Sequence, residues 1–233
     1  MPSALDGLAP RIAAAAVTKA TSKGFVRMSG LVSGFDRAHQ VLERSHPVPL
    51  GVMKRLGILT GGGDCPGLNA AIRGVVRTAV GIHGLEVLGF EDGWRGVMDG
   101  EVRELPISAV QGILHRGGTI LGSSGADPYH QGRVETVHAA FAGLGLDALV
   151  VIGGDGTLRT AARLAEEGLP VVAIPKTIDN DLAGTDACLG FHTAVQVATD
   201  AIDRLHTTAE SHDRLMLVEV MGRSSGWIAL SRS

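Results

Sequence analysis

Residues 150–181 read VVIGGDGTLRTAARLAEEGLPVVAIPKTIDND, and this stretch decides the fold class. Its two apolar runs, Leu149–Ile152 and Val171–Ile174, are rich in β-branched residues and carry no charge. Such runs are typical of parallel strands that are buried on both faces, and the segment between them has helical character. The stretch therefore predicts a strand, helix, strand unit, in which ligands bind beyond the carboxyl ends of the strands.

A glycine cluster, Gly153–Thr157, follows the first of these strands. Glycines lack a Cβ, so an anion can approach the backbone closely, and the helix expected from about Thr157 presents free N–H groups to it. A phosphate group would fit there, and Asp155 would hold a hydrated Mg²⁺. A strand-to-helix turn with a capping residue explains the same letters equally well.

A second polar cluster, PKTIDND at 175–181, follows the next strand. Proline, asparagine and aspartate are common in turns. The lysine Lys176 and the two carboxylates of Asp179 and Asp181 are more charge than a turn requires, which favours a functional interpretation.

Composition limits the classes of partner. The chain has 233 residues, of which 45% are hydrophobic and 19% charged, a balance typical of globular proteins. Glycine is abundant at 33 residues and aromatics make up only 3%, which favours phosphate cradles over base-stacking platforms. The net charge of −3 and the lack of a long apolar run predict neither a nucleic-acid nor a membrane partner. The 2 cysteines lack CxxC spacing, so we expect no zinc site or disulfide and a cytoplasmic location.

Residues 1–52 differ in composition from the remainder and are expected to form a leader rather than a domain. They are rich in alanine and basic residues. Met53 immediately precedes the first clear strand, so an upstream miscalled start explains the leader better than an organelle transit peptide does.

From Lys54 the chain alternates between strands and helices. A strand at Arg55–Thr60, the loop GGGDCPG and a helix at Leu68–Val80 form another strand, glycine loop and helix, without the GxGxxG or GxxxxGK[ST] pattern. The other expected elements are a strand at Leu85–Phe90, loops at Glu91–Gly100 and 115–125, a helix at Gly132–Leu144, a helix at His192–Thr208 with Val195, Ala198, Ile202 and Leu205 facing the core, a strand at Arg214–Val220 and a loop at 221–227. Ser231–Ser233 interrupts a final helix, which suggests that the sequence is incomplete.

Seven motifs occur in one order: TGGGDCPGLNAAIRGVVR, GGTILGSS, VVIGGDGT, PKTIDND, AIDRL, ESHDR and VEVMGR. In this order and spacing they resemble the 6-phosphofructokinase family, from about Met53 to Leu230. The resemblance implies an α/β fold with a Rossmann-like parallel sheet sandwiched by helices. Residues 53–230 would form the nucleotide-binding domain with part of the substrate domain, and the rest of the second, substrate domain would be largely missing.

The resemblance also implies residue roles. The donor phosphates would be met by Gly62, Gly63, Gly154, Asp155, Gly156 and Thr157, with Asp155 at the Mg²⁺. The sugar phosphate would be met by Lys176, Thr177, Ile178, Asp179, Asp181, Met221, Gly222 and Arg223, with Asp179 as the base. Arg214 would reach the substrate of a neighbouring subunit, which implies a homo-oligomer, a dimer or a tetramer.

The implied activity is the ATP-dependent phosphorylation of fructose 6-phosphate to fructose 1,6-bisphosphate in glycolysis. Gly125 stands where the family usually has an arginine, and Arg133 could substitute for it. Lys176 is similar to pyrophosphate-using members, whereas Gly156 is similar to ATP-using members. ATP is favoured as the donor, and the alternatives are a pyrophosphate-dependent enzyme or an inactive nucleotide-binding fragment.

Overall fold

A sheet of six strands forms the centre of the computed structural model, which describes residues 53–231. The strands are β1 (Arg55–Gly61), β2 (Glu86–Phe90), β3 (Val102–Glu104), β4 (Ala148–Gly153), β5 (Val171–Thr177) and β6 (Leu189–Gly190). The helices are α3 (Leu68–Gly81), α4 (Trp94–Asp99), the 3₁₀ turn η1 (Ile107–Val110), α5 (Val134–Gly143), α6 (Asp155–Glu166), α7 (Phe191–Ser211) and α8 (Trp227–Leu230). The expectation for residues 1–52 lies outside the described residues.

The strand order is β3-β2-β1-β4-β5-β6, and every neighbouring pair is parallel except β2 and β3. From β1 the chain crosses to β2 on one side and later to β4 on the other. The order therefore reverses between β1 and β4. In open α/β sheets, the crevice at the carboxyl ends of two such strands is where ligands bind.

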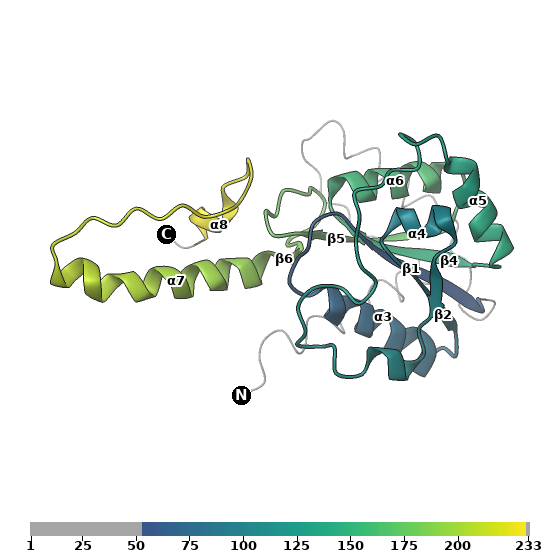
Figure 1. The fold of residues 1–233 in the computed structure, drawn as a ribbon, viewed down its shortest axis with the longest axis horizontal. Coiled ribbons are helices and arrows are strands. Elements are labelled where there is room, and N and C mark those ends of the chain that lie inside the picture. The colour runs from purple at the N-terminus through teal and green to yellow at the C-terminus, as the bar shows by residue number, and fades with distance from the viewer. Residues whose placement is uncertain (1–52, 232–233) are drawn as a thin grey trace.

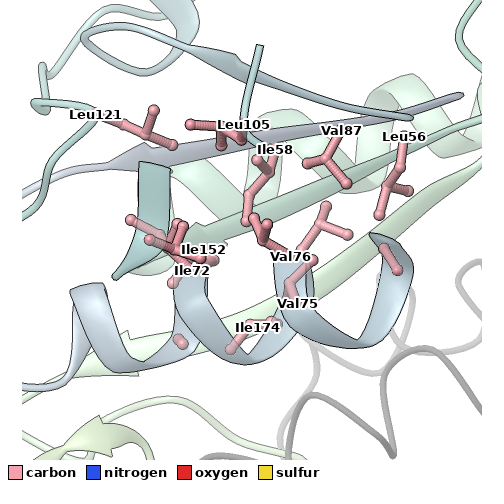
Figure 2. Packing of buried hydrophobic residues seen from close by; sticks show 14 of the residues in the cluster. Leu56, Ile58, Ile72, Val75, Val76, Val87, Leu105, Leu121, Ile152 and Ile174 are labelled. Atoms are coloured by element: carbon pink, nitrogen blue, oxygen red, sulfur yellow. The ribbon is translucent and has the colours of Figure 1, made fainter. Parts of the chain in front are cut away.

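Both faces of the sheet are buried. Successive side chains of each strand point to opposite sides, so each strand contributes to two cores. Ile58, Val150 and Ile152 pack with α3 and η1 on one face. Figure 2 shows Ile58 and Ile152 beside labelled residues of α3. Leu59, Leu149 and Val151 pack against residues of α4, α5 and α6 on the other face. Figure 1 shows these helices covering the two sides of the sheet. The predicted parallel sheet sandwiched by helices is confirmed.

A carboxylate joins the two central strands at their amino ends. Asp147 Oδ2 accepts hydrogen bonds from the backbone N–H of Lys54 at 2.6 Å and of Arg55 at 2.8 Å. These bonds hold the pKa of Asp147 below its usual range, the Arg55 N–H having the largest effect. The start of β4 is thereby fixed against the start of β1.

One segment expected to be a loop, Glu91–Gly100, instead contains helix α4. Gly93 precedes the helix with φ of 65° and Gly100 ends it with φ of 75°. Trp94, Val97 and Met98 are all buried, which is helical spacing over a single turn. Two glycines in positive φ bound this turn, so the glycines that indicated a loop are the ends of a short helix.

The last part of the chain differs most from expectation. Helix α7 forms as predicted, but the stripe of Val195, Ala198, Ile202 and Leu205 is only half-buried, because α7 runs away from the sheet with α8 beside it (Figure 1). The strand predicted at Arg214–Val220 is absent, and Leu215 and Leu217 are 99% exposed. A strand needs a hydrogen-bonded neighbour, and none of the described strands lies beside this segment. Among the helices of residues 53–231, none combines the length and hydropathy needed to cross a bilayer.

We predict that Asp147→Ala lowers the free energy of unfolding by about 1 kcal/mol near pH 7, because the N–H groups of Lys54 and Arg55, one exposed and one half-buried, lose a charged acceptor. A carboxyl whose folded pKa is lowered stabilises the fold above its unfolded pKa of about 4, and this stabilisation is lost as the pH falls through the folded value. Urea unfolding should therefore show a difference between wild type and variant that shrinks toward acid pH. Asp186→Ala, at an exposed position, is the control. A pH-independent difference contradicts the assignment.

Candidate functional site

Two glycines at the ends of β1 and β4 leave the space in which the head of α6 packs. A Cβ built on Gly61 would lie 2.6 Å from Thr157 Cγ2, and one on Gly153 would lie 2.5 Å from Thr157 Cβ. Any side chain at either position would displace Thr157. The absence of both Cβ atoms therefore lets α6 begin directly above the crevice between β1 and β4.

The first glycine loop continues from β1. Gly62 has φ of 81°, a conformation that glycine adopts at little cost. Its N–H donates to Ser124 O at 3.1 Å, and Ser123 Oγ donates to Gly62 O. Gly63 is exposed, with no atom within 4 Å of the place where a Cβ would be. The segment 115–125 thus forms the predicted glycine-rich loop, and it lies against the first one.

One residue that sequence reasoning did not single out orders this neighbouring loop. Asn69 in α3 is 1% exposed, and its Nδ2 donates to Arg116 O at 3.0 Å and to Gly117 O at 3.1 Å. Its Oδ1 accepts from the N–H of Ile120 at 2.8 Å. A polar residue among the apolar positions of an amphipathic helix was the available signal.

The second glycine loop leads into α6. The helix begins at Asp155, two residues before the expected start at Thr157, and Gly154 precedes it without a side-chain cap. The first-turn N–H groups therefore have no side-chain oxygen from Gly154, and an anion can accept from them. Trp94, which is 1% exposed, donates from Nε1 to Thr157 O at 3.4 Å.

Asp155, the predicted metal ligand, is paired with Arg159 one turn further along α6. Among residues 53–231, no three His, Cys, Asp or Glu side chains are grouped so that they could hold a metal ion. The single carboxylate of Asp155 fits Mg²⁺ that arrives bound to phosphates, because Mg²⁺ keeps most of its waters and needs only one or two protein carboxylates.

Lys176 links the end of β5 to the first glycine loop. Its side chain is buried, with 4% exposure, and Nζ donates to Gly63 O at 2.7 Å. Burial lowers the pKa of Lys176, and the nearby Cys65, Asp64 and Asp179 oppose that change. A cation is thus held beneath the glycines, beside Asp179.

The polar loop after β5 has a defined shape. The N–H of Asp179 donates to Thr177 Oγ1 at 3.0 Å. Asn180 adopts φ of 51°, and its Oδ1 accepts from the N–H of Cys188 at 2.8 Å. Ile178 packs against the core on the α3 side. These contacts leave the Asp179 carboxylate at the carboxyl edge of the sheet.

The loop 221–227, called here the MGR loop, contacts this polar loop. Ser225 Oγ donates to Asp179 O at 2.6 Å, although the two residues are 46 positions apart in the sequence. Arg223 Nη1 lies 3.7 Å from Asp181 Oδ2. Gly222 is buried and Met221 is 73% exposed. The structure therefore brings Lys176, Thr177, Asp179, Asp181 and Arg223 together. Arg214 is exposed in the extended segment after α7 and is not part of this group.

Arg133 does not occupy the position left by Gly125. Its Nη1 lies 2.7 Å from Asp99 Oδ1 and its Nη2 donates to Met98 O at 2.6 Å. Both partners belong to the last turn of α4, whereas the first residue of α4, Trp94, meets α6. Arg133 is thus held at the end of α4 away from the glycine loops.

A cysteine packs the first glycine loop against β6. Cys65 Sγ donates to Leu189 O at 3.1 Å, and burial raises the pKa of its thiol to about 12. Gly190 has φ of 99°, and a Cβ there would lie 1.9 Å from Cys65 Sγ. The absence of this Cβ keeps the loop and β6 in contact.

The strand order and the two glycine loops at its reversal define the class of doubly wound α/β domains whose ligands bind at the carboxyl edge. The profile of the family "Phosphofructokinase" matches residues 55–233. The chain therefore belongs to the phosphofructokinase family.

The names of similar proteins include two phosphoryl donors, pyrophosphate and ATP. The chain is 60% identical over 177 residues to "Pyrophosphate--fructose 6-phosphate 1-phosphotransferase" of Amycolatopsis methanolica, covering 76% of this chain and 52% of the relative. It is 59% identical over 177 residues to "ATP-dependent 6-phosphofructokinase 3" of Streptomyces coelicolor, with the same coverage. The chain thus spans about half the length of the curated relatives that it matches.

Solved structures agree with the fold. Phosphofructokinase from Saccharomyces cerevisiae is 33% identical with a TM-score of 0.68, covering 77% of this chain and 27% of that one. A pyrophosphate-dependent phosphofructokinase from Marinobacter aquaeolei is 27% identical with a TM-score of 0.65, covering 77% of this chain and 49% of that one.

We predict that Gly190→Ala destabilises the fold by more than Gly84→Ala does. Both glycines have positive φ, so both changes carry a strain of about 1–3 kcal/mol, but only Gly190 faces another atom within 4 Å. In a Cys65→Ala background, Gly190→Ala should cost less, because the clashing sulfur is gone. Urea unfolding of the single and double variants measures this coupling. An equal cost of Gly190→Ala in both backgrounds would contradict the packing role of Cys65.

Proposed function

We propose that residues 53–231 form the donor site and part of the acceptor site of a cytoplasmic 6-phosphofructokinase. Its reaction is the transfer of a phosphoryl group from ATP to fructose 6-phosphate, which gives fructose 1,6-bisphosphate. The observation that carries the proposal is the bond from Lys176 Nζ to Gly63 O at 2.7 Å. It holds a glycine loop suited to phosphates against the end of β5, the strand that precedes Asp179.

On the donor side, the chain supplies backbone N–H groups rather than cations. Gly63 on one loop and Gly154, Gly156 and Thr157 on the other lie at the carboxyl ends of β1 and β4. Gly62 shapes the first loop, because its N–H is bound to Ser124 O. Phosphoryl transfer needs mainly positioning and neutralisation of charge, which N–H groups at a helix start provide. Mg²⁺, bound to the phosphates and through water to Asp155, would supply part of the positive charge that the phosphates need.

On the acceptor side, Asp179 takes the proton of the attacking sugar hydroxyl. A carboxylate is ionised at neutral pH and accepts the proton as the hydroxyl becomes acidic in the transition state. The contacts from Thr177 and Ser225 fix the backbone of this residue on both sides. Thr177, Ile178, Asp181, Met221, Gly222 and Arg223 would bind the sugar phosphate.

The choice of ATP rests on Gly156. No atom lies within 4 Å of the place where its Cβ would be, so the space for the α-phosphate of a nucleotide is open. Lys176 favours the second candidate, a pyrophosphate-dependent enzyme, because its cation lies directly under the first glycine loop. Arg214, exposed after α7, would serve a neighbouring subunit in a homo-oligomer, a dimer or a tetramer.

We predict that Asp179→Asn lowers kcat by roughly 10²–10⁴-fold with little change in KM, because the amide keeps the shape of the loop but cannot accept the proton. The assay uses a chimera in which residues 53–231 replace the matching part of the Streptomyces coelicolor relative. Asp186→Asn, also in the segment after β5 but exposed, is the control. A loss below about tenfold would show that Asp179 is not the base.

Gly156→Asp should weaken ATP binding while sparing pyrophosphate, because a carboxylate there repels an α-phosphate that pyrophosphate lacks. The backbone at Gly156 accepts a side chain and the space is open, so the fold should persist. Calorimetry with each Mg²⁺-bound donor measures the two affinities. Equal losses for both donors would contradict the placement of the α-phosphate.

A further inference from the structure

The donor phosphates need a cationic side chain that the proposed site has not yet supplied. Charge on the transferred group is usually neutralised by an arginine or lysine as well as by metal and backbone donors. Gly125 has no side chain, Arg133 is bound to Asp99 and Met98, and Lys176 is bound to Gly63. The helices that follow the two glycine loops, α3 and α6, carry further arginines.

Arg159 has the required place. It lies one turn into α6, and long side chains on a helix point back toward its amino end. Its Nη2 indeed bonds to Asp155 Oδ2 in the first turn of α6. The guanidinium therefore already lies over the turn whose N–H groups face the crevice, and its side chain remains 71% exposed.

The space around this pair suits a phosphate. Asp155 lies between Gly154 and Gly156, and no atom lies within 4 Å of the Cβ position of Gly156. An Asp–Arg pair spaced four residues apart on a helix surface contributes only about 0.3–0.5 kcal/mol, so exchange of its partners is inexpensive. A phosphate oxygen can replace the carboxylate as the acceptor of Arg159.

We propose that Arg159 is a positioning residue for the phosphoanhydride of the donor, which its guanidinium binds once Asp155 turns to the hydrated Mg²⁺. The inference deepens the proposed function and rests on it. Asp155 and Arg159 then form an exchange pair: each neutralises the other in the free chain, and each takes a ligand of opposite charge when the donor binds. A guanidinium is well suited to this exchange because its planar donors fit carboxylate and phosphate alike.

The first experiment measures the affinity of the purified 233-residue chain for Mg²⁺-bound ATP and Mg²⁺-bound pyrophosphate by calorimetry. Arg159→Met should weaken both by roughly tenfold to a hundredfold, and Arg159→Lys by less, since lysine keeps the charge without the planar fork. Arg77→Met, an exposed change on α3, controls for the loss of one positive charge. Arg133→Met tests the alternative arginine.

The outcomes separate the two proposals. If wild type binds neither donor, the donor site is wrong and the role of Arg159 falls with it. If wild type binds and Arg159→Met changes affinity by less than about twofold, or no more than Arg77→Met does, only the role of Arg159 is overturned. A loss with Arg133→Met alone assigns the charge to that residue instead.

A second measurement identifies the exchange itself. Without Mg²⁺, Asp155→Asn should strengthen the binding of free pyrophosphate, because Arg159 is released and a repelling carboxylate is removed. In an Arg159→Met background, the same change should give a clearly smaller gain. A purely structural pair on the helix surface would give equal effects in both backgrounds, and that result would overturn the proposal.

Discussion

The close approach of α6 to the two central strands is the constraint on which the crevice depends. Gly61 and Gly153 end neighbouring strands, and Thr157 fills the space that their missing side chains leave. Because Thr157 is in the first turn of α6, its packing sets where the helix begins and where its free N–H groups point. The apolar residues on both faces of the sheet then stabilise an arrangement that these three small residues define.

In the free chain, the two cations nearest the glycine loops are already bound to groups of the protein. Lys176 is bound to a carbonyl and Arg159 to a carboxylate, while backbone N–H groups face the crevice. The MGR loop adds Arg223 near Asp181, which ties the polar loop after β5 to a distant part of the sequence. A donor and an acceptor can therefore be placed by groups that already have defined positions.

Periodicity and glycine placement were sufficient to predict β1, β2, β4 and β5, because buried parallel strands and strand-to-helix glycine loops have strong local signals. The short strands β3 and β6, of 3 and 2 residues, were not predicted. The positions of Gly62, Gly154 and Asp179 at one edge followed from their places directly after predicted parallel strands. The contact of Lys176 with Gly63 and the diversion of Arg133 to α4 could not be predicted, because they depend on where side chains end in space. The segment Arg214–Val220 has the alternation of a strand, yet alternation says nothing about whether a neighbour is present to accept its hydrogen bonds.

The indole of Trp94 gives the molecule an internal optical probe. It is the buried first residue of α4, and its N–H reaches the carbonyl of Thr157 at the head of α6. The chain has only 2 tryptophans, and the other, Trp227, is 48% exposed beside the MGR loop. Replacing Trp227 by phenylalanine would leave a single emission signal that reports on the polarity and packing at the start of α6, without any label attached to the protein.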